Sequence, residues 1–599
     1  MEQKKARKAG IMDILRSPYA HRFFKKYKWS YLLGMAILIV IDSAQTEVPR
    51  IVGQVIDGIK YTTIDESGFA SAIVRMAVIA VLVLAGRIGW RYCIFGAARK
   101  IERDMRNDLF SHLNTLPVSY FHEHNAGEIM AYMTNDIEAV RMTFAATIMM
   151  GLDMITIGVT TLLKMIFQID FRLSLVTVIP LSMVAFVSMF VGREMHKRFT
   201  KRQEVFAKVS DFVQEKLSGI KVIKAFVQEE KEIAAFEAVN SESRTANIRD
   251  AKVQAFMFPF MHMIAGCSMA IAIAYGGYIA ILGRITVGDF SAFVQYLNML
   301  VWPIASIGRI INVVTRGSAS LKRVESVLHT ESDIKDALPE IATTEPVKGE
   351  IEARELTFRY PGTDRDVLKD ISFHIEPGQT LGIVGRTGAG KTTLVNLMLR
   401  IIDPDDDMLY IGGREIHTIP LQTLRASTGY VMQDNFLFSD TIRNNIAFGD
   451  HTKSFEEIQQ AAKMACVHDN IVDFPDGYET MVGERGVSLS GGQKQRISIA
   501  RALILDPEIL ILDDALSAVD TDTEEKKLEN LKTLRHGKTN IIIAHRISTL
   551  QNADKIIVVD GSRIIEEGNH EELVAQGGMY ADLYRRQLLE KMKKEEYKL

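Results

Sequence analysis

A glycine-rich segment in the middle of the chain sets the strongest limit on how the residues around it can fold. Residues 385–392 read GRTGAGKT and fit the pattern G-x-x-x-x-G-K-[ST]. A strand-like apolar run, Thr380–Val384, precedes the segment, and a helix-like run, Leu394–Leu399, follows it. Glycines let backbone N–H groups turn toward phosphates without a Cβ in the way. The segment therefore predicts a nucleoside triphosphate site, in which Lys391 reaches the β- and γ-phosphates and the Thr392 hydroxyl holds Mg²⁺.

Further motifs follow this segment along the chain. Gln433 stands in GYVMQD, and the string LSGGQ at 489–493 is followed by KQR. The strand-like run ILILD at 509–513 ends in a carboxylate, SAVD occupies 517–520, and His545 stands in IIIAHR. Taken alone, LSGGQ would indicate little more than a helix start with serine as its N-cap. The joint order and spacing of the motifs resemble the ATPase domain of ATP-binding cassette (ABC) proteins.

The resemblance implies a role for each motif. Tyr360 would stack on adenine, and Gln433 would sense Mg²⁺ and face the membrane half of the protein. Asp513, at the end of its strand, would belong to the Walker B site for Mg²⁺. Residues 517–520 resemble the D-loop, and His545 resembles the switch histidine.

The resemblance also implies ATP and Mg²⁺ as cofactors. The residues that it implies for Mg²⁺ are Thr392, Gln433 and Asp513, and those for catalysis are Asp514, His545 and Gln433. The residues implied for nucleotide binding come from one aromatic side chain, the glycine-rich segment and LSGGQ. They are Tyr360, Gly385, Arg386, Thr387, Gly388, Ala389, Gly390, Lys391, Thr392, Thr393, Ser490, Gly491, Gly492 and Gln493.

One residue departs from the family pattern. The Walker B strand of the family normally ends in Asp-Glu, and the Glu orients and activates the attacking water, whereas this chain reads Asp513-Asp514. Asp is one methylene shorter than Glu. A general base must lie within hydrogen-bond reach of its water, and a misplacement of about 1 Å can cost roughly 10²-fold in rate. We therefore expect Asp514 to be a poor base unless the backbone moves to compensate.

LSGGQ, in contrast, is intact. In this family the signature covers the γ-phosphate held by the loop of a second cassette, so that two cassettes enclose two ATP molecules. We therefore expect this chain to hydrolyse its own ATP slowly, while Ser490, Gly492 and Gln493 complete a competent site on a different partner. The expected partner is a second ABC half-transporter in a heterodimer. The alternative is a homodimer that tolerates Asp514.

Length and composition indicate two unlike halves. The 599 residues are too many for one hydrophobic core. Residues 1–330 carry long apolar runs, whereas 340–599 read as a soluble α/β domain. The net charge of −3 decides nothing about nucleic acid, but the soluble half has no polybasic stripe, and we expect no nucleic-acid partner. The three cysteines lack metal-ligand spacing and suit a reducing cytosol; they are Cys93, Cys267 and Cys466.

Six apolar segments in the first half predict membrane-spanning helices, each near the ~20 residues that cross the hydrocarbon layer. A basic N-terminal segment, with a short interfacial helix at His21–Trp29, marks the cytoplasmic side. An even number of spans then returns the chain to the cytoplasm, where an ATPase must lie. We expect a multi-pass protein of the cell membrane, in contact with lipid. The spans lie at 29–50, 70–96, 140–168, 172–192, 255–282 and 290–312, and polar residues break the first and the last.

Two polar, helix-prone stretches join the spans on the cytoplasmic side. One covers 97–139, and the other, of roughly sixty residues, joins the fourth and fifth spans. Twenty to thirty helical residues reach about 30–45 Å, so we expect the helices to continue far into the cytoplasm. Tyr120–Met130 and Glu215–Ala225 resemble the intracellular segments of the exporter branch of the family. In that branch, two short coupling helices at the loop tips transmit motion from the ATPase.

Ionisable residues inside spans are costly and usually face a cavity or a partner. Asp153 and Lys164 are eleven residues apart, close to three turns, and share one helix face. That face either lines a translocation path or pairs with neighbouring helices, and the sequence leaves both open. The other residues of this kind are Asp42, Glu47, Arg75, Arg87 and Arg91.

The predicted fold is multidomain, with an all-α six-helix transmembrane domain that has long cytoplasmic extensions, followed by an α/β P-loop NTPase domain. The predicted function is ATP-driven export of a hydrophobic or amphipathic substrate such as a drug, lipid or peptide. An ATP-binding regulatory membrane subunit is an alternative, whereas the apolar first half argues against a DNA- or ribosome-associated cassette ATPase. The expected boundaries are 1–28 for the N-terminal segment, 29–315 for the membrane domain, 316–348 for a linker, 349–590 for the ATPase domain and 591–599 for a charged tail.

Overall fold

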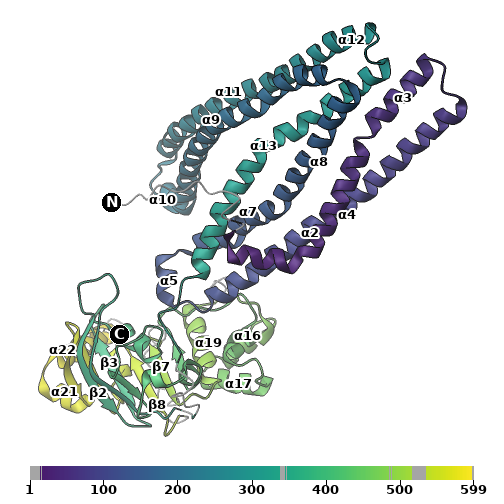
Figure 1. Cartoon of the computed structure of the whole chain (residues 1–599). Helices are drawn as coiled ribbons and strands as arrows, with labels where there is room; N and C mark the ends of the chain where they lie inside the picture. The colour runs from purple at the N-terminus through teal and green to yellow at the C-terminus, as the bar shows by residue number, and fades with distance from the viewer. Residues whose placement is uncertain are drawn as a thin grey trace. The chain divides into compact units, whose positions relative to one another are not determined.

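The computed structural model describes residue 14 and residues 16–336, 345, 347–483, 486, 489–515 and 535–596. Within these ranges it describes the backbone alone for 184–196, 257–258, 261, 305, 591 and 593–596. Contacts divide the chain into two units, Met1–Thr115 with His124–Thr330, and Leu116–Glu123 with Glu331–Leu599. The first unit is helical and the second is α/β (Figure 1).

The helical unit consists mainly of long helices joined by short connections. Several are interrupted by single π-helical turns, at Tyr132–Asp136, Thr143–Thr147, Met165–Ile169 and Ala272–Gly276. The helices are α2 (Pro18–Gln45), α3 (Val48–Lys60), α4 (Glu66–Leu113), α6 (Ala126–Ala131), α7 (Ile137–Met142), α8 (Ile148–Lys164), α9 (Phe171–Ser218), α10 (Ile220–Ala225), α11 (Glu229–Ile271), α12 (Gly277–Ile281) and α13 (Val287–Leu328).

The predicted spans agree with these helices. Within the described residues, five helical stretches are long and apolar enough to cross a membrane: Pro18–Lys60, Glu66–Leu113, Ala126–Ile169, His262–Ile281 and Val287–Leu328. The remaining predicted span, 172–192, lies in α9, where the apolar stretch Phe171–Met183 is described. The first span is broken as predicted, at Thr46 and Glu47 between α2 and α3. The last span is not broken, because α13 continues through Pro303.

The helices also continue well beyond the membrane, as predicted. α4 and α9 have 48 residues each and α11 has 43. At about 1.5 Å per residue, each is longer than the roughly 30 Å of the hydrocarbon layer. α9 and α11 lie side by side (Figure 1), and Arg202 of α9 lies 2.7 Å from the buried Asp250 of α11. The short helices α5 (Val118–Glu123) and α10 stand where the coupling helices were expected, and contacts place α5 in the α/β unit.

The N-terminal segment is set apart from the first span by a kink. Tyr27, inside α2, has a non-helical backbone with φ −108° and ψ 15°. On the N-terminal side of the kink, the Lys26 ammonium lies 2.5 Å from the carboxylate of the buried Asp104 of α4, and the Tyr27 hydroxyl donates to the same carboxylate at 2.8 Å. The kink therefore falls inside the interfacial helix predicted at His21–Trp29, and the interfacial position of that segment stays a prediction.

α13 runs through the middle of the helical unit and carries much of its core. Phe293, Tyr296 and Leu300 are almost fully buried. Near its start, α13 meets α3 at two glycines. A Cβ on Gly288 would lie 2.1 Å from the Gly53 carbonyl oxygen, so glycine is required for this close approach of the backbones.

The linker expected at 316–348 is wrong in its first part, because α13 continues to Leu328. Gly317, which reads as a break, instead permits close packing, since a Cβ there would lie 1.8 Å from the Thr143 hydroxyl oxygen. Arg323 then forms an ion pair with Asp136. These contacts hold residues 316–328 in the helix.

Among its described residues, the α/β unit contains two sheets (Figure 1). Its buried apolar residues form two clusters. The six-stranded sheet has the order β10-β9-β3-β8-β7-β6 and the four-stranded antiparallel sheet has the order β2-β1-β4-β5. β9, β3, β8, β7 and β6 are parallel, whereas β10 pairs with β9 in the antiparallel sense. The strands are β1 (Ile351–Phe358), β2 (Leu368–Ile375), β3 (Thr380–Gly385), β4 (Leu409–Ile411), β5 (Arg414–Glu415), β6 (Thr428–Val431), β7 (Ile509–Asp513), β8 (Thr539–Ile543), β9 (Lys555–Asp560) and β10 (Arg563–Gly568).

Helices flank this sheet and connect its strands. The longest between β6 and β7 is α19, which packs on β6 and on its neighbours α16 and α17. The helices are α14 (Lys391–Met398), α15 (Leu421–Ala426), α16 (Ile442–Ile446), α17 (Phe455–Met464), α18 (His468–Val472), α19 (Gly491–Leu503), α21 (His570–Gln576) and α22 (Met579–Glu596).

Candidate ATP site

The carboxyl ends of four neighbouring parallel strands bring the predicted site residues to one edge of the sheet. β3 ends at Gly385, where the glycine-rich loop begins, and β7 ends at Asp513. Gln433 follows β6 by two residues, and His545 follows β8 by two residues. Ligands of open α/β sheets bind outside this edge of the strands.

The glycine-rich loop has the form of a phosphate cradle. Gly388 and Gly390 have φ of +81° and +96°, which residues with a Cβ rarely adopt. A Cβ on Gly385 would lie 2.1 Å from the Val559 carbonyl oxygen, so the loop starts against the backbone of β9. α14 begins directly at Lys391, so the free backbone N–H groups of its first turn point toward the loop. The loop therefore fits the triphosphate of a nucleotide.

The remaining loop residues divide into an exposed tip and a buried base. Arg386, Thr387 and Gly388 are exposed, whereas Ala389 and Gly390 are buried. The Lys391 ammonium is buried and donates to the carbonyl oxygens of Gly385 at 2.9 Å and Arg386 at 3.0 Å. These two bonds hold the lysine within the loop.

A hydrogen bond joins the loop to the Walker B strand. The Thr392 hydroxyl donates to Asp513 Oδ2 at 2.9 Å, so these two predicted Mg²⁺ ligands are neighbours. Burial raises the pKa of Asp513, and the charge of Asp514 adds to this effect, whereas the Thr392 hydrogen bond and the charges of Lys391 and His545 lower that pKa. A divalent cation at the two oxygens would stabilise the charged carboxylate in the same way.

Asp514 has an unusual and firmly held backbone. Its φ is +47°, in the left-handed region, which Asp tolerates better than most residues with a Cβ. Its N–H donates to the Ile543 carbonyl oxygen at 2.9 Å, and the Gln495 side chain donates to its carbonyl oxygen at 3.3 Å. Both peptide groups of the residue are thus tied to neighbouring elements.

Gln495 is a supporting residue that the sequence analysis did not identify. It is 2% exposed and lies on α19, two residues after the signature. A glutamine on the buried face of an amphipathic helix is unexpected, because an amide buried without a partner is costly. The signal in the sequence was this glutamine of KQR at a position on the buried face of the helix.

Tyr360 lies beside the loop. Its hydroxyl is 3.1 Å from the hydroxyl oxygen of Thr393, in the first turn of α14, and its ring packs edge-on against Phe358. The ring is therefore near the phosphate loop, as an adenine-stacking residue would be, and that role stays a prediction.

LSGGQ forms the start of α19. The Ser490 hydroxyl accepts from the Gln493 N–H at 3.3 Å, and the Gln493 side chain accepts from the Ser490 N–H at 2.9 Å, which makes a capping box. Gly491 and Gly492 occupy the first turn. Each of the two side chains thus bonds to the backbone N–H of the other residue. Gln433 and His545 are exposed, and the expected D-loop, 517–520, lies outside the described residues.

Two charged residues of α8, Asp153 and Lys164, contact residues of the first span. Lys164 of α8 donates to Glu47 Oε1 at 2.7 Å and to the Thr46 hydroxyl oxygen at 2.9 Å. Asp153, on the same helix, is in hydrogen-bonding contact with Asp42 of α2. Of the two interpretations left open by the sequence, pairing with a neighbouring helix therefore holds for both residues.

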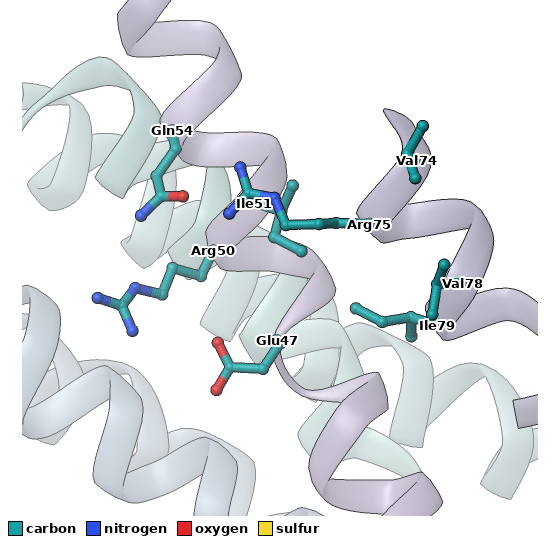
Figure 2. A pocket seen from close by; sticks show the side chains of 8 residues that line it. All are labelled: Glu47, Arg50, Ile51, Gln54, Val74, Arg75, Val78 and Ile79. Atoms are coloured by element: carbon teal, nitrogen blue, oxygen red, sulfur yellow. The ribbon is translucent and has the colours of Figure 1, made fainter. Parts of the chain in front are cut away.

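A cavity of about 550 Å³ lies between α3 and α4 in the membrane half. Figure 2 shows the Arg75 side chain reaching from α4 toward α3, and Arg50 and Gln54 on α3 itself. The wall is mixed, with charged, amide and aliphatic side chains. The lining residues are Glu47, Arg50, Ile51, Gln54, Val74, Arg75, Val78 and Ile79.

Two family models match the chain. The ABC transporter transmembrane region covers residues 31–304, and the ABC transporter model covers residues 368–517. The two are fused in one chain, in the order membrane region and then ATPase.

Curated relatives match over nearly the full length. The probable multidrug resistance ABC transporter ATP-binding/permease protein YheI of Bacillus subtilis is 38% identical over 95% of this chain and 97% of its own. The multidrug resistance-like ATP-binding protein MdlA of Escherichia coli is also 38% identical, over 95% of this chain and 96% of its own. The ATP-dependent lipid A-core flippase of Desulfotalea psychrophila is 35% identical over 94% and 97%.

A solved structure has the same architecture. The structure of a bacterial Atm1-family ABC exporter with ATP bound matches with a TM-score of 0.78 and 25% identity, over 93% of this chain and 98% of that chain.

Fold, site and relatives define a membrane transporter driven by a cassette ATPase. The chain belongs to the ABC transporter family, in the branch of half-transporters that fuse one membrane region to one ATPase domain. It is a multi-pass membrane protein with the ATPase domain on the cytoplasmic side, and it couples ATP hydrolysis to export.

Proposed function

We propose that the chain is one half of a heterodimeric exporter for hydrophobic or amphipathic compounds, and that its own ATP site hydrolyses slowly. The observation that carries the proposal is Asp514 in the position of the family's catalytic Glu, in a site that otherwise has the expected residues. The proposed Mg²⁺ ligands are Thr392, Gln433 and Asp513, and His545 is the proposed switch histidine. When bound, Mg²⁺ stabilises the charge of the phosphoryl oxygens.

The backbone of Asp514 supports a weak base. A short side chain could act at full rate only if its Cα moved toward the water. The Ile543 carbonyl holds the residue's N–H, and the Gln495 amide holds its carbonyl oxygen. Moving the Cα would strain both bonds, so the carboxylate stays short of the position that a Glu would reach.

The signature supports a second, different partner. Ser490, Gly492 and Gln493 are all present, and the capping box presents them at the start of a regular helix. A chain that supplies an intact signature but a weak base is most useful beside a chain with a strong base. A homodimer would place a weak base in both sites.

The substrate class rests on the relatives and on the membrane half. The relatives include multidrug resistance proteins and a lipid A-core flippase, which supports a hydrophobic or amphipathic substrate. The cavity between α3 and α4 combines Arg50 and Arg75 with aliphatic side chains, which fits an amphipathic compound.

The test is ATP turnover by this chain purified alone in lipid, with ATP binding measured on the same sample. Tight binding with negligible turnover is expected, and turnover should rise when a second half-transporter with a Walker B Glu is added. Rapid turnover by the chain alone would contradict the proposal and establish a homodimer with a competent Asp514. Turnover of the pair that no transported compound stimulates would favour the regulatory subunit instead.

A further inference from the structure

Two carboxyl groups meet inside the membrane half. Asp42 lies in the last turn of α2, in the first span, and Asp153 lies on α8, in the third. The two side chains are in hydrogen-bonding contact. Asp42 is 4% exposed, and its Oδ2 and the Oδ1 of Asp153 are buried without an N–H or O–H donor among the described residues.

Two ionised carboxylates would not remain in this contact. An ionised carboxylate has no proton to donate. A hydrogen bond between the two groups therefore requires that one of them is protonated. Two negative charges in hydrogen-bonding contact repel each other strongly. Paired carboxyl groups of this kind share one proton instead. The hydrocarbon layer raises the cost of a second charge further. The last turn of a helix also disfavours an anion, because the macrodipole is negative there, and this acts on Asp42 directly.

The positive charge near the two carboxyl groups can balance one negative charge but not two. Arg87 of α4 attracts both carboxyls, while its guanidinium donates to Gln45 at 3.3 Å. On α8 itself, Lys164 is bound by Glu47. The other packed helices carry their charges elsewhere: Arg91 of α4 lies over the Trp90 ring, and on α13 Arg309 lies over the Trp302 ring and Asp289 caps the helix start.

We propose that Asp42 and Asp153 form a proton-binding site, which holds one proton between α2 and α8. The group of three then carries no net charge, with one carboxylate balanced by Arg87. Separation of α2 from α8 during transport breaks the shared bond and exposes the carboxyls to water, where the proton leaves. The proton returns when the helices close, so this step of the cycle depends on pH.

Infrared spectroscopy of the purified full-length chain in lipid tests the site, because a protonated carboxyl absorbs apart from a carboxylate. The variants are Asp42→Asn and Asp153→Asn, in which the amide N–H takes the place of the shared proton and keeps the helix contact. The exposed Glu66, in the first turn of α4, gives the control Glu66→Gln. We expect a protonated-carboxyl band near neutral pH that both Asn variants lose and the control keeps.

The proposal is wrong if the wild-type protein has no such band, or if the band is unchanged in either Asn variant. A variant that misfolds is recognised by the loss of its thermal unfolding transition. In that case the presence or absence of the band in the wild-type protein decides the test. This experiment needs neither ATP nor a partner, so it is independent of the proposed slow ATP site.

A second measurement tests the link to transport. Addition of a non-hydrolysable ATP analogue to wild-type pairs in weak buffer should release about one proton per carboxyl pair, without the protons that ATP hydrolysis would add, read with a pH indicator. Asp42→Asn pairs should release none from this site, and their transport rate should vary less with pH than that of wild type. Equal release by wild type and variant would overturn the coupling.

Discussion

At the scale of single residues, we propose that Asp514 limits how fast this chain hydrolyses ATP. Its carboxylate is one methylene short of the usual base, and its φ of +47° is one that Asp adopts more readily than Glu. The site therefore combines a short base with a backbone that suits it. A side chain of the usual length at this position should restore ATP hydrolysis at a small cost in backbone strain.

Asp514→Glu should raise ATP turnover by about 10- to 100-fold, because it returns the carboxylate to within reach of the water. The measurement is steady-state phosphate release by the chain in lipid, with ATP affinity determined in parallel. Asp514→Asn, which has the same length but no base, serves as the control and should not raise turnover. A flat or lower rate for the Glu variant would count against the slow-site proposal.

Lys391→Ala should abolish ATP binding at this chain's own loop, because the lysine supplies the positive charge nearest the β- and γ-phosphates. Equilibrium binding of a fluorescent ATP analogue measures this. Lys463→Ala, at an exposed position of α17, should leave binding unchanged. Unaltered binding by the Lys391 variant would remove the lysine from the site.

At the scale of elements, α3 and α13 are held together where two glycines meet. Gly288 also donates its N–H to Asp57 Oδ1 at 2.7 Å, so the contact is both close and polar. A side chain at this position must push the helices apart.

Gly288→Ala should destabilise the helical unit by about 1–3 kcal/mol, because its Cβ would lie 2.1 Å from the Gly53 carbonyl oxygen. Thermal unfolding of the full chain in detergent would show a lower transition. Gly277→Ala is the matched control, since nothing lies within 4 Å of its Cβ. Equal transitions for the two variants would mean that the helices can separate freely there.

Elements with a local signal were predictable. Apolar length predicted the spans, and the run of charged, proline-poor residues predicted their extensions. The family motifs predicted Thr392 and Asp513 as ligands of one Mg²⁺ ion, and their side chains are neighbours. Features that depend on distant contacts were not predictable. Gly317 looks like a helix end until Thr143 is seen against it, and nothing near Gln495 in sequence indicates its bond to Asp514.

At the scale of the whole molecule, the proposed function has the chain contribute to two different nucleotide sites. Its glycine-rich loop would serve one site, and its signature would serve the other. A variant at the signature should therefore act on the partner's ATP and not on its own.

Ser490→Ala should lower the ATP turnover of the pair by about tenfold or more, because a positioned donor to the γ-phosphate is lost. ATP binding at this chain's own loop should not change. The variant also loses a helix cap worth about 1 kcal/mol. Ser454→Ala removes the same kind of capping box from α17 and controls for that loss. Equal effects of the two variants on turnover would assign Ser490 a purely structural role.

The bond between Gln495 and Asp514 has one more consequence. Gln495 lies on the helix that begins with the signature, so this helix is hydrogen-bonded to the segment that carries Asp514. In the proposed dimer, a partner's nucleotide that moves the signature helix would also act on the position of Asp514. Hydrolysis at the two sites would then be coupled through one amide.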